Sequence, residues 1–169
     1  NMMIWPFVNA FYADACTRTG DYERFTFELF NLVDLGLNKG GNDFWEIYDP
    51  KDGHPDGGWQ TGSHWGGLQH QTWSATGLLR MVWYGLVGMR FEDEKLRFEP
   101  FLPEEVNSLE LTRLNYGNMI LNVKLEGEGN RIKEFKLNGI AMDTPEIPQN
   151  LTGEQTVSIV LEKSNGYQH

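Results

Sequence analysis

The stretch QTWSATGLLRMVWYGLVGMRFEDEKLRFEPF, residues 71–101, contains the point at which the chain changes from helix to strand. Its first part belongs to a run over His70–Met89 that is apolar nearly all round apart from Arg80, which is typical of an interior helix. After Gly88, apolar and polar residues alternate with period two, and this pattern predicts a β-hairpin over residues 89–101. The stretch therefore predicts an α+β chain, with a helical part before the join and a β part after it.

Two further helices are predicted upstream. Apolar residues recur at helical spacing over Trp5–Thr17, where Pro6 fits the first turn and Gly20 can end the helix. Asp21 can cap a second helix, which extends to Asn38 and is apolar on several faces. A helix that is apolar on several faces must be covered on several faces. We therefore expect further helices to precede this sequence in the natural protein.

Downstream of the hairpin, turn sequences such as EGEGN and Asn138-Gly139 separate short segments with the period-two pattern. These segments predict strands over residues 108–114, 119–126, 132–137 and 156–162. Short strands at this spacing are typical of an antiparallel β-sandwich. The predicted organisation is thus a helical domain over residues 1–89, which includes a long loop over 39–69, and an antiparallel β-sandwich domain over 90–169.

The composition of the 169 residues is that of a globular chain, with 40% hydrophobic and 22% charged residues. The formal net charge of −10 disfavours phosphate backbones and anionic membranes, and no apolar run reaches the roughly 18 residues of a membrane helix. We expect a neutral ligand, no nucleic acid and no membrane. The single cysteine, Cys16, is expected to be a small buried hydrophobe and can form no intramolecular disulfide. The start NMMIWPF lacks the features of a signal peptide and leaves the localisation open.

The loop NDFWEIYDPKDGHPDGGWQTGSHWGG, residues 42–67, collects groups suited to binding a carbohydrate. Glu46 stands among aromatic and aliphatic neighbours that partly shield it from water, an environment that suits a general base near neutral pH. Tryptophan faces can stack on sugar C–H groups, while amides, hydroxyls and imidazoles can hydrogen-bond sugar hydroxyls. The candidates are Trp45, Trp59, Trp65 and Trp73 for stacking, and Gln60, Ser63, His64, His70 and Gln71 for hydrogen bonding.

Metal and nucleotide sites fit this loop poorly. The spacing of His54, His64 and His70 matches no zinc pattern, and DPKDGHPDGG lacks the alternating oxygen ligands of an EF-hand. No phosphate-loop lysine follows the glycines. We therefore expect no metal and no cofactor. Each tryptophan is also compatible with a structural core and Glu46 with a surface carboxylate, so a non-catalytic carbohydrate-binding module and a purely structural domain stay open as alternatives.

The order of IWPFVNAFYADA, FWEIYDPKDG, a glycine-rich stretch, QTWSATGLLRMVWYGLVGMR and LRFEPFLP resembles the C-terminal end of the (α/α)6, or six-hairpin, glycoside hydrolases. Similar runs occur in glucoamylases, glycogen-debranching amylo-1,6-glucosidases and processing α-glucosidases, and a β-sandwich after an aromatic-Glu run is similar to the α-L-rhamnosidases. The resemblance covers Ile4 to about Pro103. It implies helical hairpins from an incomplete (α/α)6 toroid, a carbohydrate substrate, and a missing N-terminal part of the same chain.

The resemblance also implies that the catalytic base falls on Glu46, the glutamate of FWEIYDP. In an inverting glycosidase this carboxylate activates water, while a protonated carboxylate about 6.5 to 9.5 Å away donates to the leaving oxygen. The resemblance places that acid in an earlier hairpin, so the chain alone is expected to hydrolyse poorly. Because the loop has histidines but no arginine, hydrolysis is favoured over phosphorolysis. The sugar subsite would be lined by Trp45, Trp59, Gln60, His64, Trp65, His70 and Trp73.

Overall fold

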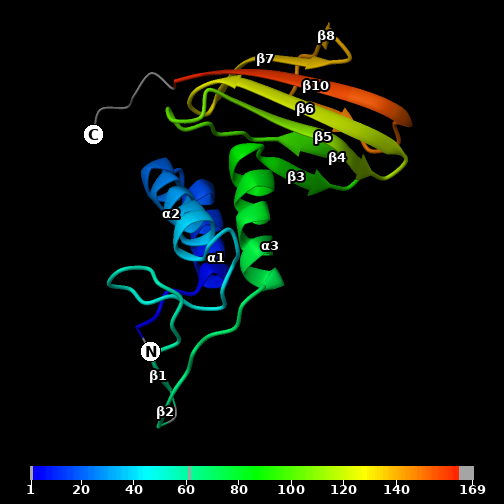
Figure 1. Ribbon diagram of the computed structural model, residues 1–169. Coiled ribbons are helices and arrows are strands. Elements are labelled where there is room, and N and C mark those ends of the chain that lie inside the picture. The colour runs from blue at the N-terminus through cyan, green and yellow to red at the C-terminus, as the bar shows by residue number, and fades with distance from the viewer. Residues whose placement is uncertain (1, 61, 164–169) are drawn as a thin grey trace. The chain divides into compact units, whose positions relative to one another are not determined.

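The computed structural model describes residues 2–60 and 62–163, and it contains helices followed by strands, as the sequence predicts for an α+β chain (Figure 1). The chain divides into two compact units, Asn1–Val82 and Trp83–His169. We call them the helical unit and the β unit. Among the described helices, none combines the length and the hydrophobicity that a bilayer-spanning segment requires.

The helical unit begins with two helices, α1 (Pro6–Thr19) and α2 (Tyr22–Asp34), and α2 continues into a π-helical turn, η1 (Leu35–Lys39). Gly20 ends α1 in the left-handed conformation, with φ 76°, which a residue without Cβ adopts at no steric cost. Asp21 caps α2 because its side chain accepts a hydrogen bond from the backbone N–H of Arg24 at 3.2 Å. The predicted stop and cap are confirmed.

The third helix of this unit, α3 (Thr72–Arg80), is shorter than predicted. It passes into a second π-helical turn, η2 (Met81–Leu86), so the run predicted over His70–Met89 is not one regular helix. Gly77 lets α3 approach α1 closely, since a Cβ at this position would lie 3.1 Å from the Ala10 side chain. The core between these helices contains mainly small residues of α1 and larger ones of α2: Ala10, Ala13, Cys16, Phe25, Leu29 and Leu32.

Cys16 is buried, as predicted, and burial raises the pKa of its thiol. The helices are not fully covered within this chain, and the sequence predicts that three such helices cannot cover one another on every face. Phe27 on α2 is 66% exposed and Leu37 on η1 is 56% exposed, while Val8 and Phe11 on α1 are also exposed. The helices therefore present apolar faces that the described residues leave uncovered.

A long loop, residues 40–71, joins η1 to α3. It contains one short antiparallel hairpin that the sequence analysis did not predict, in which β1 (Trp59–Gln60) pairs with β2 (Ser63–His64). Isolated bridges join Tyr48 to Ile4 and to Pro55. Most of the loop is therefore irregular, but its middle is fixed to the start of the helical unit.

The β unit contains two sheets. The predicted hairpin is confirmed as β3 (Met89–Glu92) and β4 (Lys95–Phe98), which form one sheet in the order β3-β4-β9. A second, five-stranded sheet has the order β5-β6-β10-β7-β8. The remaining strands are β5 (Ser108–Tyr116), β6 (Met119–Gly127), β7 (Arg131–Leu137), β8 (Ile140–Ala141), β9 (Glu146–Pro148) and β10 (Gly153–Glu162).

Ring contacts join the two sheets, as in a sandwich. Phe98 of β4 meets Phe135 of β7 with ring centroids 5.5 Å apart, and Phe91 of β3 meets Tyr116 of β5 at 5.4 Å. On β6 and β10 every second residue is buried, which is the predicted period-two pattern. Phe91 stays exposed, whereas Leu96 and Phe98 are buried.

One strand pair corrects the prediction of a purely antiparallel sandwich. β10 lies between β6 and β7 and pairs antiparallel with β7 but parallel with β6, over Gly153–Leu161. A parallel pair needs a connection of a dozen or more residues, and residues 128–152 supply it because they include β7, β8 and β9. The other pairs between named strands are antiparallel.

Candidate functional site

The segment Phe44–Glu46 is hydrogen-bonded to the chain that leads into α3 and to α3 itself. The backbone N–H of Gln71 donates to the carbonyl of Phe44 at 2.8 Å, and the N–H of Glu46 donates to the carbonyl of Leu68 at 2.7 Å. The hydroxyl of Ser74, which is fully buried, donates to the carbonyl of Trp45 at 3.1 Å. These bonds fix the backbone that carries Glu46.

The next two residues, Ile47 and Tyr48, anchor the same segment in the core of the helical unit. Both are 0% exposed, and Tyr48 exchanges backbone hydrogen bonds with Ile4 at 2.9 and 3.0 Å. The Tyr48 hydroxyl accepts a hydrogen bond from the N–H of Trp45 at 2.9 Å, and burial raises the pKa of this tyrosine. Trp45 and Glu46, in contrast, are only half-buried. Glu46 thus lies at the surface of a well-anchored segment.

Among the residues that the structure describes, Trp65 is the side-chain partner of the Glu46 carboxylate. Its Oε2 accepts a hydrogen bond from the indole Nε1–H of Trp65 at 3.1 Å. The Trp65 ring is 44% exposed, so water reaches both groups. The structure therefore brings together two of the predicted site residues, and the partial shielding of Glu46 agrees with its predicted environment.

A second carboxylate, Asp43, lies three positions before Glu46. Its Oδ1 accepts a hydrogen bond from the N–H of Phe44 at 2.8 Å, while its Oδ2 is buried without a hydrogen-bond donor among the described groups. His70 Nδ1 lies 2.7 Å from this Oδ2, at ion-pair distance but without hydrogen-bond geometry. His70 adopts a left-handed backbone with φ 58° and is exposed. It lies beside Asp43, a neighbour that the sequence analysis did not identify.

His64 belongs to a chain of alternating acidic and imidazole groups. Its Nε2 lies 2.9 Å from Asp56 Oδ1, and His54 contacts Asp52 through Nδ1 at 2.6 Å and Asp56 through Nε2 at 3.5 Å. The hydrogen bond that the His54 ring donates to Asp52 raises the pKa of His54, and the same pairing lowers the pKa of Asp52. The pKa of Asp56 is lowered first by the backbone N–H of Gly58 and then by His64. These contacts stabilise the loop as a set of charged turns.

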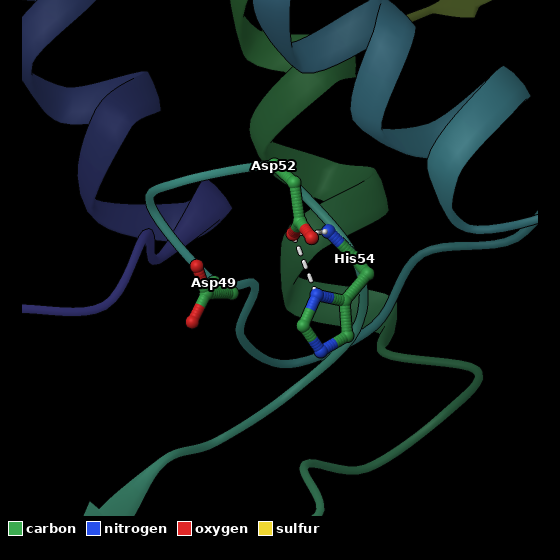
Figure 2. A group of neighbouring side chains, drawn as sticks. All are labelled: Asp49, Asp52 and His54. Carbon is green, nitrogen blue, oxygen red and sulfur yellow. Dashed lines mark hydrogen bonds and ion pairs between the residues drawn. The ribbon is translucent and has the colours of Figure 1, made fainter.

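Asp49, Asp52 and His54 come close enough to share a cation, since one ligand atom from each lies within 4.8 Å of the others. Figure 2 shows Asp52 bound to both the ring and the backbone nitrogen of His54, while Asp49 has no marked interaction with either. Asp49 Oδ1 instead accepts a hydrogen bond from the N–H of Lys51 at 2.8 Å. Turn hydrogen bonds thus account for these three side chains, of which Asp52 and His54 are exposed and Asp49 is half-buried, and their geometry alone assigns no metal.

The other predicted aromatic residues divide between the loop and the helices. Trp73 stacks on Phe7 of α1 with centroids 5.5 Å apart and an interplanar angle of 16°. Both rings line a recess of about 480 Å³ beside Phe11 and Arg80. Trp73 is therefore associated with α1 and not with the Glu46 carboxylate. The side chains of Trp59 and Gln60 lie outside the described part, although their backbone forms β1.

A protein-family model described as the C-terminal domain of glycosyl hydrolase family 65 matches residues 89–140, from the start of β3 into β8. No curated protein matches the chain. The match makes the chain glycoside hydrolase-related through its β unit. It does not include the helical unit, so Glu46 and its neighbours lie outside the matched residues.

Proposed function

We propose that the chain is the C-terminal part of a six-hairpin glycoside hydrolase, in which Glu46 is the general base for inverting hydrolysis of an O-glycosidic bond. Residues 1–89 would contribute the last helices of the catalytic domain, with 39–69 as the active-site loop, and residues 90–169 the accessory β-sandwich. The observation that carries the proposal is the half-buried Glu46 carboxylate on a segment anchored by the backbone bonds of Phe44–Glu46. The family match in the β unit supports a carbohydrate as the substrate.

The proposed chemistry needs an ionised carboxylate that can reach a water molecule. Glu46 would take a proton from the water that attacks the anomeric carbon, while a protonated carboxylate about 6.5 to 9.5 Å away donates to the leaving oxygen. Asp43 is a poor candidate for that acid, because it lies on the same short segment and its Oδ2 is buried beside His70. The acid would come from an earlier hairpin of the parent protein.

The exposed apolar faces of the helical unit support the same proposal. Phe27, Leu37, Val8 and Phe11 are large side chains that protein interiors usually cover. In an (α/α)6 toroid, neighbouring hairpins would bury these faces. The parent protein would then supply both the missing cover for the helices and the missing acid.

The test is a comparison of the parent protein with its Glu46→Gln variant on a panel of α-glycosides. Loss of a general base is expected to lower kcat about 10²- to 10⁴-fold, and NMR of the first product should show the inverted anomer. Glu105→Gln is the matched control, because Glu105 is exposed and has no partner among the described residues. Equal turnover by Glu46→Gln and the parent would exclude Glu46 as the base.

Binding and turnover of the glycoside, measured separately in the Glu46→Gln parent, distinguish this proposal from a non-catalytic binding module. A Glu46→Gln parent that still binds the glycoside but no longer cleaves it supports catalysis by the carboxylate. A parent protein that binds sugars but cleaves none of them, before and after the substitution, favours the binding module.

A further inference from the structure

We propose that Trp65 is a positioning residue for Glu46: its indole N–H holds one carboxylate oxygen and so directs the other toward the attacking water. This inference rests on the proposed function of Glu46. Its basis is the 3.1 Å hydrogen bond from Trp65 Nε1 to Glu46 Oε2, which joins residues 19 positions apart. It gives Trp65 a task different from the sugar stacking that the sequence predicts.

The indole is itself fixed in place. The backbone N–H of Trp65 donates to the carbonyl of Gly58 at 2.7 Å, next to the β1–β2 hairpin. The ring edge lies against Gly57, where an added Cβ would collide with Trp65 Cδ1 and with the Trp65 carbonyl oxygen. The same Cβ would lie 2.7 Å from Ile47 Cδ1, in the buried residue that follows Glu46. Only glycine at position 57 leaves room for this arrangement.

The chemistry of the two groups suits this role. An indole N–H can donate but cannot accept a hydrogen bond, so Trp65 can hold Glu46 only through a carboxylate oxygen that acts as the acceptor. Among the groups that the structure describes, none donates to the other oxygen, Oε1 of Glu46. One oxygen is thus held while the other keeps its lone pairs for water. A general base needs this combination of fixed direction and free acceptor.

Glu46 is held both by its backbone and by Trp65, so its carboxylate should have little orientational freedom left to lose when substrate binds. Two backbone-anchored segments meet in this contact: Phe44–Tyr48, bound to the start of α3, and the strand region around Trp65, bound to Gly58. If only the indole bond is removed, the carboxylate can rotate away from the water while the sugar subsite stays in place. We therefore expect a loss in kcat with little change in KM.

The first test uses the parent enzyme with Trp65→Phe, which keeps an aromatic ring but removes the N–H. A hydrogen bond to a charged group of typical strength predicts a fall in kcat of about 10- to 100-fold with KM within about threefold. Trp83→Phe is the control, because it also removes an indole N–H, but one that lies in the β unit and far from Glu46 in sequence. A kcat for Trp65→Phe equal to that of the control would overturn the inference.

The second test needs no activity and uses the chain itself. In a ¹H–¹⁵N spectrum of the unmutated chain, nuclear Overhauser contacts to neighbouring protons assign the Trp65 indole resonance, and Glu46→Gln should shift that resonance while leaving the Trp83 indole in place. An unmoved Trp65 indole would overturn the inference even if Trp65→Phe failed to fold. Loss of turnover in Glu46→Gln together with normal kcat in Trp65→Phe would refute the positioning role alone, whereas normal turnover in Glu46→Gln would refute the proposed function.

Discussion

The buried hydroxyl of Ser74, in the first turn of α3, donates to the backbone carbonyl of Trp45, 29 positions earlier in the chain, at 3.1 Å. A helix thereby fixes the residue that immediately precedes Glu46. Because the donor lies in a regular element and the acceptor in an irregular loop, the helix limits how far the loop can move. The position of the candidate base thus depends on a hydrogen bond in which its own side chain takes no part.

Ser74→Ala should destabilise the helical unit by about 1–2 kcal/mol, since it leaves the half-buried Trp45 carbonyl without this donor. Urea unfolding followed by tryptophan fluorescence measures the change, because every tryptophan except Trp83 lies in this unit. Thr76→Ala is the control: the Thr76 hydroxyl only bonds back to Thr72 on the exposed side of the same helix. Its effect should stay within about 0.5 kcal/mol, and equal losses in both variants would contradict the anchoring role of Ser74.

Gly57→Ala should disturb the seat of the Trp65 indole, because the new Cβ would collide with a backbone oxygen that cannot rotate away. We expect a loss of about 1–3 kcal/mol in the stability of the helical unit, together with a shift of the Trp65 indole resonance. Gly66→Ala provides the comparison, since a Cβ at Gly66 would meet no atom within 4 Å. A Gly57→Ala variant as stable as Gly66→Ala would show that the loop around Trp65 is not closely packed.

The acidic and imidazole groups at residues 52–56 should make the loop sensitive to pH in both directions. The pKa of His54 is raised above its ordinary 6.5 by Asp52, so this stabilisation is complete below pH 6.5 and is lost as the pH rises through the raised value. The pKa values of Asp52 and Asp56 are lowered from 3.8, so their contribution is complete above pH 3.8 and is lost as the pH falls through the lowered values. The loop is therefore best ordered between these limits.

An NMR titration of the His54 ring checks this expectation. The ring should titrate above pH 6.5 in the wild-type chain, and Asp52→Asn should bring its titration closer to 6.5 because it removes the main partner. His54 titrating at or below 6.5 in the wild type would contradict the observed pairing. Amide exchange of Gly53 and Gly58, whose N–H groups bond to Asp49 and Asp56, reports the order of the loop itself.

The elements with a strong repeating pattern could be predicted from the sequence. The alternation of β6 and the capping residues between α1 and α2 are local signals, and the structure agrees with them. β8 and β9 were missed because two or three residues are too few to establish a period. The parallel pairing of β10 with β6 was also missed, since strand order depends on which edges meet in space and leaves no local trace.

The candidate site likewise has features that the sequence predicts and contacts that it does not predict. Glu46 could be proposed as the candidate base from its aromatic surroundings and from a family resemblance, both of which can be read along the chain. The bond from Trp65 to Glu46 and the contact of His70 with Asp43 join the two ends of a glycine-rich loop, and they depend on left-handed turns such as that at His70. Residue type predicts that such side chains are useful, but only the folded loop determines which of them meet.

Because β10 lies between β6 and β7, the five-stranded sheet cannot be completed until β10, which ends at Glu162, has been synthesised. Until then β6 and β7 each present an open edge of unpaired backbone groups, and such edges can pair with strands of other molecules. A nascent β unit therefore passes through an interval in which it is prone to aggregate. The arrival of its last strand covers both edges at once, so translation speed and chaperone access near the end of this segment should influence the yield of folded protein.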